Sequence, residues 1–216
     1  MSNSSLVNYT KISPNSTNPR RNTIKKITIH HMAGNLSVEN CGNIFASESR
    51  QASSNYGIGS DGRVGMYVEE KNSAWTSSNA DNDNQAITIE VANDVIGGNW
   101  HVSDKALAKL IDLCVDICKR NKIKKLNFTG NAKGNLTMHK YFAATACPGE
   151  YLESKFPYIA EEVNKRLAQK PVNILDEDLS VLAKHGVMNT PAYWKTKAPT
   201  VQYLPELIHN MAEKLK

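Results

Sequence analysis

Two histidines and one cysteine, contributed by segments more than a hundred residues apart, are of the types that hold a metal ion. The first segment is Thr28-Ile-His-His-Met32, and the second is His139-x7-Cys147-Pro148-Gly149. Imidazole nitrogen and thiolate sulfur are ligands that Zn²⁺ prefers, and three protein ligands leave its fourth position open for water. Zinc-bound water is a nucleophile at neutral pH. The two segments together therefore predict a catalytic zinc site.

His30 and His31 compete for the position in the first segment. Successive side chains of a strand point to opposite faces of the sheet, so only one of the two can enter a given site. Ile27 and Ile29 point away from His30, which places His30 on the more polar face of the strand. A register shifted by one residue would exchange the two roles.

Alternation and helical periodicity predict the elements that position these residues. Residues 24–31 alternate and are rich in β-branched side chains, which predicts a strand that ends at the histidine pair. Further strands are expected at 55–59, 63–69, 86–92 and 126–129, the first two joined by a hairpin at Ser60-Asp61-Gly62. Helices are expected at 37–49, 103–121, 150–168, 176–185 and 201–215. The mixture predicts an α/β fold with a central mixed sheet flanked by helices and a small all-α appendage at the C-terminus.

Composition excludes several classes of protein. No apolar run in the 216 residues approaches the ~20 residues that a membrane span requires, so no membrane partner is expected. The net charge of +5 favours an acidic polymer. The strongest basic run, residues 119–125, falls where a helix is expected to end and complements the helix dipole there. No nucleic-acid partner is therefore expected.

The other cysteines and the first residues indicate where the chain is made. Cys41, Cys114 and Cys118 are expected to pack as small hydrophobes. Residues 1–6 have neither the charged start nor the apolar core of a secretory signal. We therefore expect synthesis in a reducing cytoplasm without a disulfide framework.

Residues 20–168 resemble the zinc-dependent N-acetylmuramoyl-L-alanine amidases of the type 2 amidase family. The resemblance rests on several ordered motifs rather than on one. They are Ile27-Thr-Ile-His-His-Met-Ala33, Asn55-Tyr-Gly-Ile-Gly-Ser-Asp-Gly-Arg-Val64, Ala74-Trp75, Ala86-Ile-Thr-Ile-Glu-Val-Ala-Asn93 and the His139-to-Gly149 segment. The resemblance implies hydrolysis of the amide between N-acetylmuramic acid and L-alanine in bacterial peptidoglycan. It also implies Zn²⁺ as the cofactor, bound by His30, His139 and Cys147.

The resemblance further implies catalytic roles for three residues. Glu90 would take the proton from the attacking water and deliver it to the leaving amine. Tyr56 and Thr145 would donate hydrogen bonds to the oxyanion as it forms. Two positions depart from the family pattern, because Thr76 stands where many relatives have histidine and Gly57 stands where some relatives have it. These departures leave the metal ligands untouched and weaken any inference about contacts in the substrate cleft.

A junction at residues 169–172 is expected to separate a catalytic domain at 1–169 from a helical module at 170–216. Wall binding, homodimerisation through its helices and packing on the catalytic domain remain open roles for this module. Its aromatic residues and one apolar stripe are expected to close a small core; they are Tyr193, Trp194, Tyr203, Leu204, Leu207, Ile208 and Met211.

The leading hypothesis is a phage endolysin or prophage-type autolysin, made in the host cytoplasm and acting on the cell wall after release. One alternative is a recognition module that binds peptidoglycan without cutting it. The other is a thiol hydrolase in which Cys147 is the nucleophile and His139 or His30 the base. Chelation separates the last reading from the first, since only the zinc enzyme loses activity on metal removal.

Overall fold

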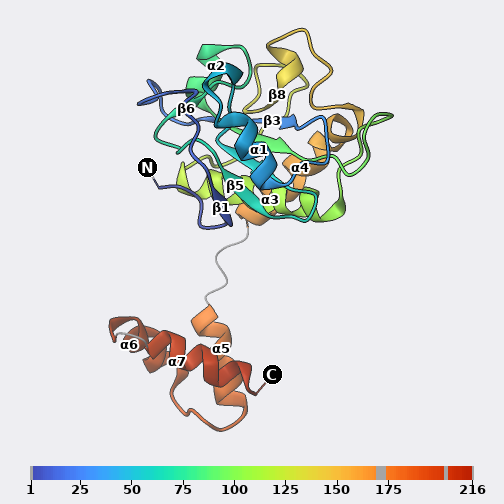
Figure 1. Cartoon of the computed structure of the whole chain (residues 1–216). Coiled ribbons are helices and arrows are strands. Elements are labelled where there is room, and N and C mark those ends of the chain that lie inside the picture. Colours follow the sequence, from blue (N-terminus) through green and yellow to red (C-terminus); the bar gives the residue numbers. More distant parts are fainter. Residues whose placement is uncertain (1, 169–173, 202–203, 216) are drawn as a thin grey trace. The chain divides into compact units, whose positions relative to one another are not determined.

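The computed structural model describes residues 2–168, 174–201 and 204–215, and the chain divides into two compact units, residues 1–168 and 169–216 (Figure 1). The predicted junction at residues 169–172 lies outside the described residues. Among the described helices, none is both long and apolar enough to cross a membrane.

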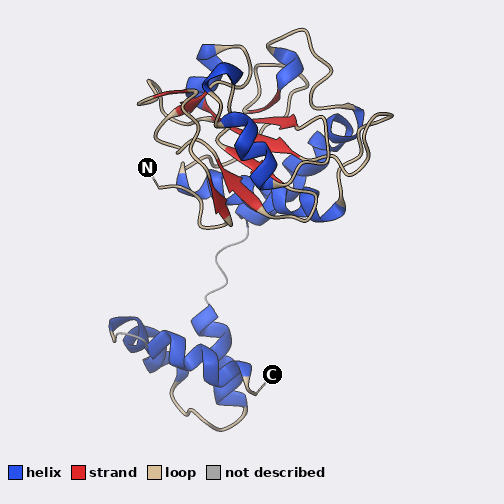
Figure 2. Ribbon diagram, viewed as in Figure 1, coloured by secondary structure: helices blue, strands red, loops and turns tan. Residues whose placement is uncertain are grey.

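The first unit has the predicted α/β fold, built on a mixed six-stranded sheet (Figure 2). Its strand order is β1-β5-β4-β7-β3-β8, in which β4 and β5 form the predicted antiparallel hairpin and the other neighbours are parallel. A separate antiparallel pair joins β2 to β6. The strands are β1 (Tyr9–Thr10), β2 (Ser16–Thr17), β3 (Lys26–His31), β4 (Tyr56–Ile58), β5 (Val64–Met66), β6 (Ser73–Ala74), β7 (Ala86–Val91) and β8 (Leu136–Met138).

Helices cover both faces of this sheet. The predicted helices are present, and those at the start and centre of the unit begin where serine side chains cap them, Ser37 for α1 and Ser103 for α3. The helices of the unit are α1 (Val38–Phe45), α2 (Ala80–Gln85), α3 (Asp104–Arg120) and α4 (Glu150–Ala168), with short 3₁₀ turns η1 (Glu48–Arg50) and η2 (His139–Tyr141).

Strand register decides which side chains face which helices. One row of the sheet contains Ile29, Ile89 and Tyr56, and it belongs to the large apolar core that also includes buried residues of α3 and α4. The next row along the same strands contains His30, Glu90 and Gly57, and it faces the opposite side. A smaller cluster of Cys41, Phe45 and Tyr67 packs α1 onto that side. The two central parallel strands therefore carry apolar side chains toward the core and polar ones toward α1.

The expected strand at residues 126–129 is not present; the sixth strand is instead β8, which pairs with β3. The backbone N–H and carbonyl of Leu126 form hydrogen bonds with a helix side chain instead of a neighbouring strand. Its N–H donates to the side-chain oxygen of Asn164 in α4, and its carbonyl accepts from the Asn164 amide nitrogen, both at 2.8 Å. A helix side chain thus satisfies the groups that a strand ladder would otherwise require.

The second unit is helical, as predicted. It consists of α5 (Ile174–Lys184), α6 (Pro191–Lys197), the 3₁₀ turn η3 (Ala198–Thr200) and α7 (Leu204–Glu213). Leu179, Leu182 and Ile208 are buried in its own small core, with Trp194 and Leu204 packed against it.

The predicted core of this unit is wrong in part, because Tyr193, Leu207 and Met211 are exposed. Ile208 lies on the face of α7 that meets α5, whereas Leu207 and Met211 lie on a different face of the same helix. Tyr203 lies outside the described residues.

Candidate metal centre

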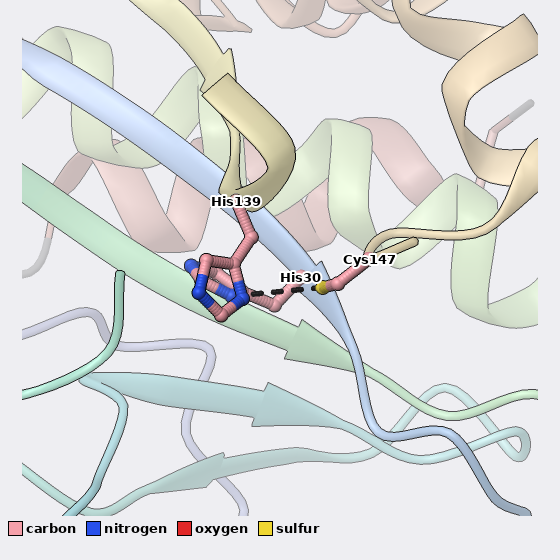
Figure 3. Close-up of side chains that lie close together, drawn as sticks. All are labelled: His30, His139 and Cys147. Atoms are coloured by element: carbon pink, nitrogen blue, oxygen red, sulfur yellow. Dashed lines mark hydrogen bonds between the residues drawn. The ribbon is translucent and has the colours of Figure 1, made fainter. Parts of the chain in front are cut away.

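His30, His139 and Cys147 meet at one end of the parallel strands. His30 lies near the end of β3, His139 opens the η2 turn directly after β8, and Cys147 lies in the loop that leads to α4. Their potential ligand atoms all lie within 4.8 Å of one another. Figure 3 shows the His30 and Cys147 side chains directed toward each other, with His139 beside them. The residues that the sequence singled out are therefore brought together by β3 and β8 ending at the same edge of the sheet.

The donor set and its distances fit a tetrahedral metal ion. The Sγ of Cys147 lies 3.7 Å from Nδ1 of His30. Two ligands at Zn–S ≈ 2.3 Å and Zn–N ≈ 2.0 Å around a tetrahedral ion would be about 3.5 Å apart. The Nε2 atom of His139 is buried and has no hydrogen-bond partner in the part of the chain that the structure describes. Buried polar atoms rarely lack partners, so this nitrogen is consistent with a bound metal.

The electrostatics of the site keep both imidazoles neutral. Burial lowers the pKa of His30 well below its usual value, and the neighbouring His139 and His31 lower it further. Burial also lowers the pKa of His139, against an opposing effect of Asp83. A neutral imidazole has a free lone pair, which metal binding requires.

His31 does not belong to the cluster, in agreement with the predicted alternation. Its ring stands edge-on to Trp100, with 5.2 Å between the ring centroids. Its backbone N–H points to Cys147 and donates to Sγ over 3.4 Å. This contact stabilises a thiolate at Cys147, whose pKa burial otherwise raises. His31 therefore supports the cysteine through its backbone.

Gly149 fixes the loop that presents Cys147. It has a φ of +84°, and a Cβ there would come within 2.9 Å of the Trp100 Cβ and 3.3 Å of the His31 Nδ1. A glycine is therefore required by both conformation and space. In the same loop, the hydroxyl oxygen of Thr145 accepts the Cys147 backbone N–H at 3.2 Å. Thr145 is exposed, and no described residue accepts the proton of its hydroxyl.

The three residues open onto a cavity of about 370 Å³. This volume lies at the lower end of the range of small-molecule sites. Glu90 and Thr145, for which the resemblance implies catalytic roles, line this cavity. The other lining residues are His31, Met32, Ala33, Leu36, Cys41, Ile44, Phe45, Arg50, Ala52, Ser53, Thr76 and Ser78.

Glu90 lies beside His30, because the parallel register pairs these two residues across β3 and β7. Its Oε2 atom is buried and has no hydrogen-bond partner among the residues described. Burial raises the pKa of Glu90 from its ordinary 4.5 to about 8, and the charge of Arg50 opposes that rise. A carboxyl with a pKa near neutrality can both accept and return a proton under physiological conditions.

Tyr56 is not brought to the cavity, so its expected role as an oxyanion donor requires correction. Its ring is fully buried in the core on the other face of the sheet. Its hydroxyl donates to Glu70 over 2.7 Å and accepts the Ser4 backbone N–H at 3.0 Å. The reason is register, because β4 pairs Gly57 with Glu90 and so turns Tyr56 away from the cluster of His30, His139 and Cys147.

The two departures from the family pattern have structural reasons. A Cβ on Gly57 would lie 2.7 Å from atoms of the Tyr67 ring, so no larger residue fits there. The Thr76 hydroxyl donates to the Ser53 carbonyl at 2.7 Å and lies within hydrogen-bond distance, 2.9 Å, of the Thr88 hydroxyl. Thr76 is thereby held against the cavity wall.

The sequence did not single out two further features. Arg50 lines the cavity from the η1 turn, and a lone arginine in a loop carries no spacing signal that would have identified it. Asp178, His209 and Glu213 of the second unit bring their potential ligand atoms within 4.8 Å of one another. The His209-x3-Glu213 spacing was visible, but its partner Asp178 comes from another helix.

Comparison with known proteins gives a family and a fold. The model of a family described as N-acetylmuramoyl-L-alanine amidase (Amidase_2) matches residues 20–150. None of the curated proteins compared with the chain matches it.

Several solved structures are similar to this chain at low identity. PlyL is 16% identical, with a TM-score of 0.57 over 72% of this chain and 95% of PlyL. The PlyG catalytic domain is 17% identical, with a TM-score of 0.57 over 76% of this chain and 96% of that domain. The endolysin N-acetylmuramoyl-L-alanine amidase LysCS from Clostridium intestinale is 21% identical, with a TM-score of 0.52 over 76% of this chain and 94% of its own. At these identities the likeness establishes the fold.

Proposed function

The chain belongs to the N-acetylmuramoyl-L-alanine amidase family, and from this premise we propose that it is a zinc-dependent hydrolase of bacterial peptidoglycan. The bond cut is the amide between the lactyl group of N-acetylmuramic acid and the L-alanine of the stem peptide. The products are the muramic acid carboxylate and a peptide with a free N-terminal L-alanine. Catalysis belongs to residues 1–168, the unit that contains the site.

The convergence of His30, His139 and Cys147 is the observation that carries this proposal. Two histidines beside a thiol, with an unpartnered buried nitrogen on His139, suit zinc, and the open cavity leaves room for water and a substrate carbonyl. Zinc bound there would lower the pKa of its water toward ~7 and polarise the scissile carbonyl.

Two side chains supply the remaining chemistry. Glu90 accepts the proton of the attacking water and delivers it to the leaving nitrogen, because its raised pKa suits both transfers. Thr145 donates a hydrogen bond from its hydroxyl to the oxyanion. The hydroxyl oxygen accepts the Cys147 N–H, and the hydroxyl proton remains available for this bond. Tyr56 takes no part, because its hydroxyl lies on the opposite face of the sheet.

We assign the enzyme to the endolysin or autolysin type, which degrades the wall after release from the cytoplasm. The structural likeness to LysCS, which is described as an endolysin, supports this assignment. The helical unit of residues 169–216 is assigned an auxiliary role, in wall binding or in self-association.

Digestion of purified peptidoglycan, before and after metal stripping, tests the activity. Mass spectrometry of the released ends should find free N-terminal L-alanine that disappears with a chelator and returns with Zn²⁺. Cleavage that survives stripping and is abolished by alkylation of Cys147 would instead establish thiol catalysis. Binding of the wall without any new ends would make the chain a recognition module.

Metal content tests the ligand set independently of activity. His30→Ala should remove bound zinc, whereas His31→Ala is its matched control and should keep it, because His31 contacts Cys147 through the backbone N–H. Zinc loss in the His31 variant with retention in the His30 variant would contradict the assigned ligands.

A further inference from the structure

Arg50 brings to the catalytic cavity a positive charge that is not neutralised by a direct partner. Apart from Glu90, it is the only Asp, Glu, Lys or Arg residue among those that line the cavity in the described chain. It is exposed, and no described side chain forms a hydrogen bond or ion pair with its guanidinium. It is close enough to Glu90 to lower the pKa of that carboxyl. The cavity thus offers a substrate one unpaired cationic group near the expected site of chemistry.

The turn that carries Arg50 is held in place on both sides. Arg50 ends η1, and the next residue, Gln51, has a φ of 47°. The Gln51 side chain donates back to the Glu48 carbonyl over 2.8 Å. The amide of Asn15, which is buried, donates to backbone carbonyls before and after Arg50, namely those of Phe45, Ser47 and Ala52. The backbone of the turn is therefore ordered before a ligand binds, so binding through Arg50 carries no entropy cost for ordering that backbone.

We propose that Arg50 binds the α-carboxylate of the second residue of the stem peptide. The inference rests on the proposed function, which places a muramoyl-L-alanyl amide at the metal. In such a substrate the sugar is uncharged and the lactyl carboxyl is consumed in the amide. The nearest anion to the scissile bond is the α-carboxylate of the D-glutamate that follows L-alanine. Two residues span at most about 7 Å, so this carboxylate falls within the cavity or at its rim.

Guanidinium suits this ligand better than any other side chain. Its planar fork can bind a carboxylate through two parallel hydrogen bonds, each assisted by charge. The enzyme would then prefer walls in which the α-carboxyl of the second residue is free over walls in which it is amidated. This preference should appear in substrate binding rather than in the chemical step, because the α-carboxylate carries the same charge before and after the amide bond is cut.

Kinetics on a matched pair of substrates test the proposal in the full-length, zinc-loaded protein. The two muramoyl tripeptides differ only in whether the α-carboxyl of the second residue is free or amidated. The natural chain should show a KM about tenfold lower for the free acid, as expected of a charged hydrogen-bonded pair. Arg50→Gln should abolish that preference. Arg21→Gln is the matched control, because it removes the same charge from an exposed position outside the cavity, and it should retain the preference.

Binding of the peptide product gives a readout without catalysis. Calorimetry on the metal-free protein should find that L-Ala-γ-D-Glu-L-Lys binds more weakly to Arg50→Gln than to the natural chain, and that amidation of the glutamate α-carboxyl removes the difference. Equal KM values for both substrates in the natural chain would overturn the role of Arg50 and leave the amidase intact. A loss of kcat in Arg50→Gln that is the same for both substrates would also overturn it, in favour of transition-state stabilisation. Failure to cleave either substrate would instead refute the proposed function.

Discussion

Replacing Tyr56 by phenylalanine separates a structural tyrosine from a catalytic one, because the two roles predict opposite results. In the structure the hydroxyl bridges Glu70 and the backbone of Ser4 on the core side of the sheet. Burial, followed by the nearby Glu70 carboxylate, raises the pKa of Tyr56, so the phenol remains protonated and acts as a donor. Removal of the hydroxyl should destabilise the fold and leave catalysis nearly unchanged.

The magnitude follows from the two hydrogen bonds. The bond to the Glu70 carboxylate is 2.7 Å long, and bonds to charged groups contribute about 1.5–3 kcal/mol. The Ser4 N–H would also lose its acceptor, although Glu70 would keep its bonds to Arg120. We therefore expect the free energy of unfolding to fall by about 2–3 kcal/mol. In a unit of this size the melting temperature should fall by roughly 4–12 °C.

Thr145→Val is the control with the opposite pattern. Thr145 is exposed, and its hydroxyl accepts one hydrogen bond, from the Cys147 N–H, so the substitution should lower the free energy of unfolding by only about 0.5–1.5 kcal/mol. Its loss as an oxyanion donor should lower kcat by about 10²-fold. The assays are thermal unfolding, turnover of a muramoyl peptide and zinc content for both variants. A Tyr56→Phe protein of unchanged stability and zinc content, whose kcat fell about 10²-fold, would refute the structural assignment of Tyr56.

Three other substitutions, two of them with a matched control variant, test the fold and the site. Glu70→Ala leaves its buried partners without their acceptor and should lower the free energy of unfolding in urea by about 3–5 kcal/mol. Glu69→Ala breaks a surface ion pair with Lys71 and should lower it by less than about 1 kcal/mol. Equal losses would argue against a buried network.

Burial raises the pKa of Glu90 to about 8 in the metal-free fold, so the ionised carboxylate opposes folding. This destabilisation should grow as the pH rises from 4.5 to 8, up to about 5 kcal/mol. The stability of metal-free Glu90→Gln relative to the natural chain should therefore rise over that range, and a difference independent of pH would contradict the shift. Gly149→Ala should weaken zinc binding, since its Cβ would meet Trp100, while Gly130→Ala, also at positive φ but in open space, should leave the zinc affinity unchanged.

The sequence by itself determined the elements with strong local signals and the residues of the candidate metal site. The alternation of residues 24–31 predicted the strand β3 and its polar face, and the cluster in the structure contains His30 and not His31. The Asp61-Gly62 turn predicted the hairpin of β4 and β5, and Ser103 marked the start of α3. These signals depend on neighbours a few residues away, so they survive without knowledge of the fold.

Tertiary structure alone decided the features that depend on distant partners. Tyr56 and Gly57 lie in a strand of three buried residues, Tyr56–Ile58, which has no polar face to indicate its orientation; pairing with β7 turned Tyr56 into the core. Arg50 lines the cavity because the side-chain amide of Asn15, distant in sequence, forms a hydrogen bond with the backbone of the turn that contains Arg50. The segment at 126–129 did not become a strand because a side chain of α4 satisfied its backbone. In each case the deciding contact joins residues far apart in the chain, and such contacts leave no trace in local periodicity.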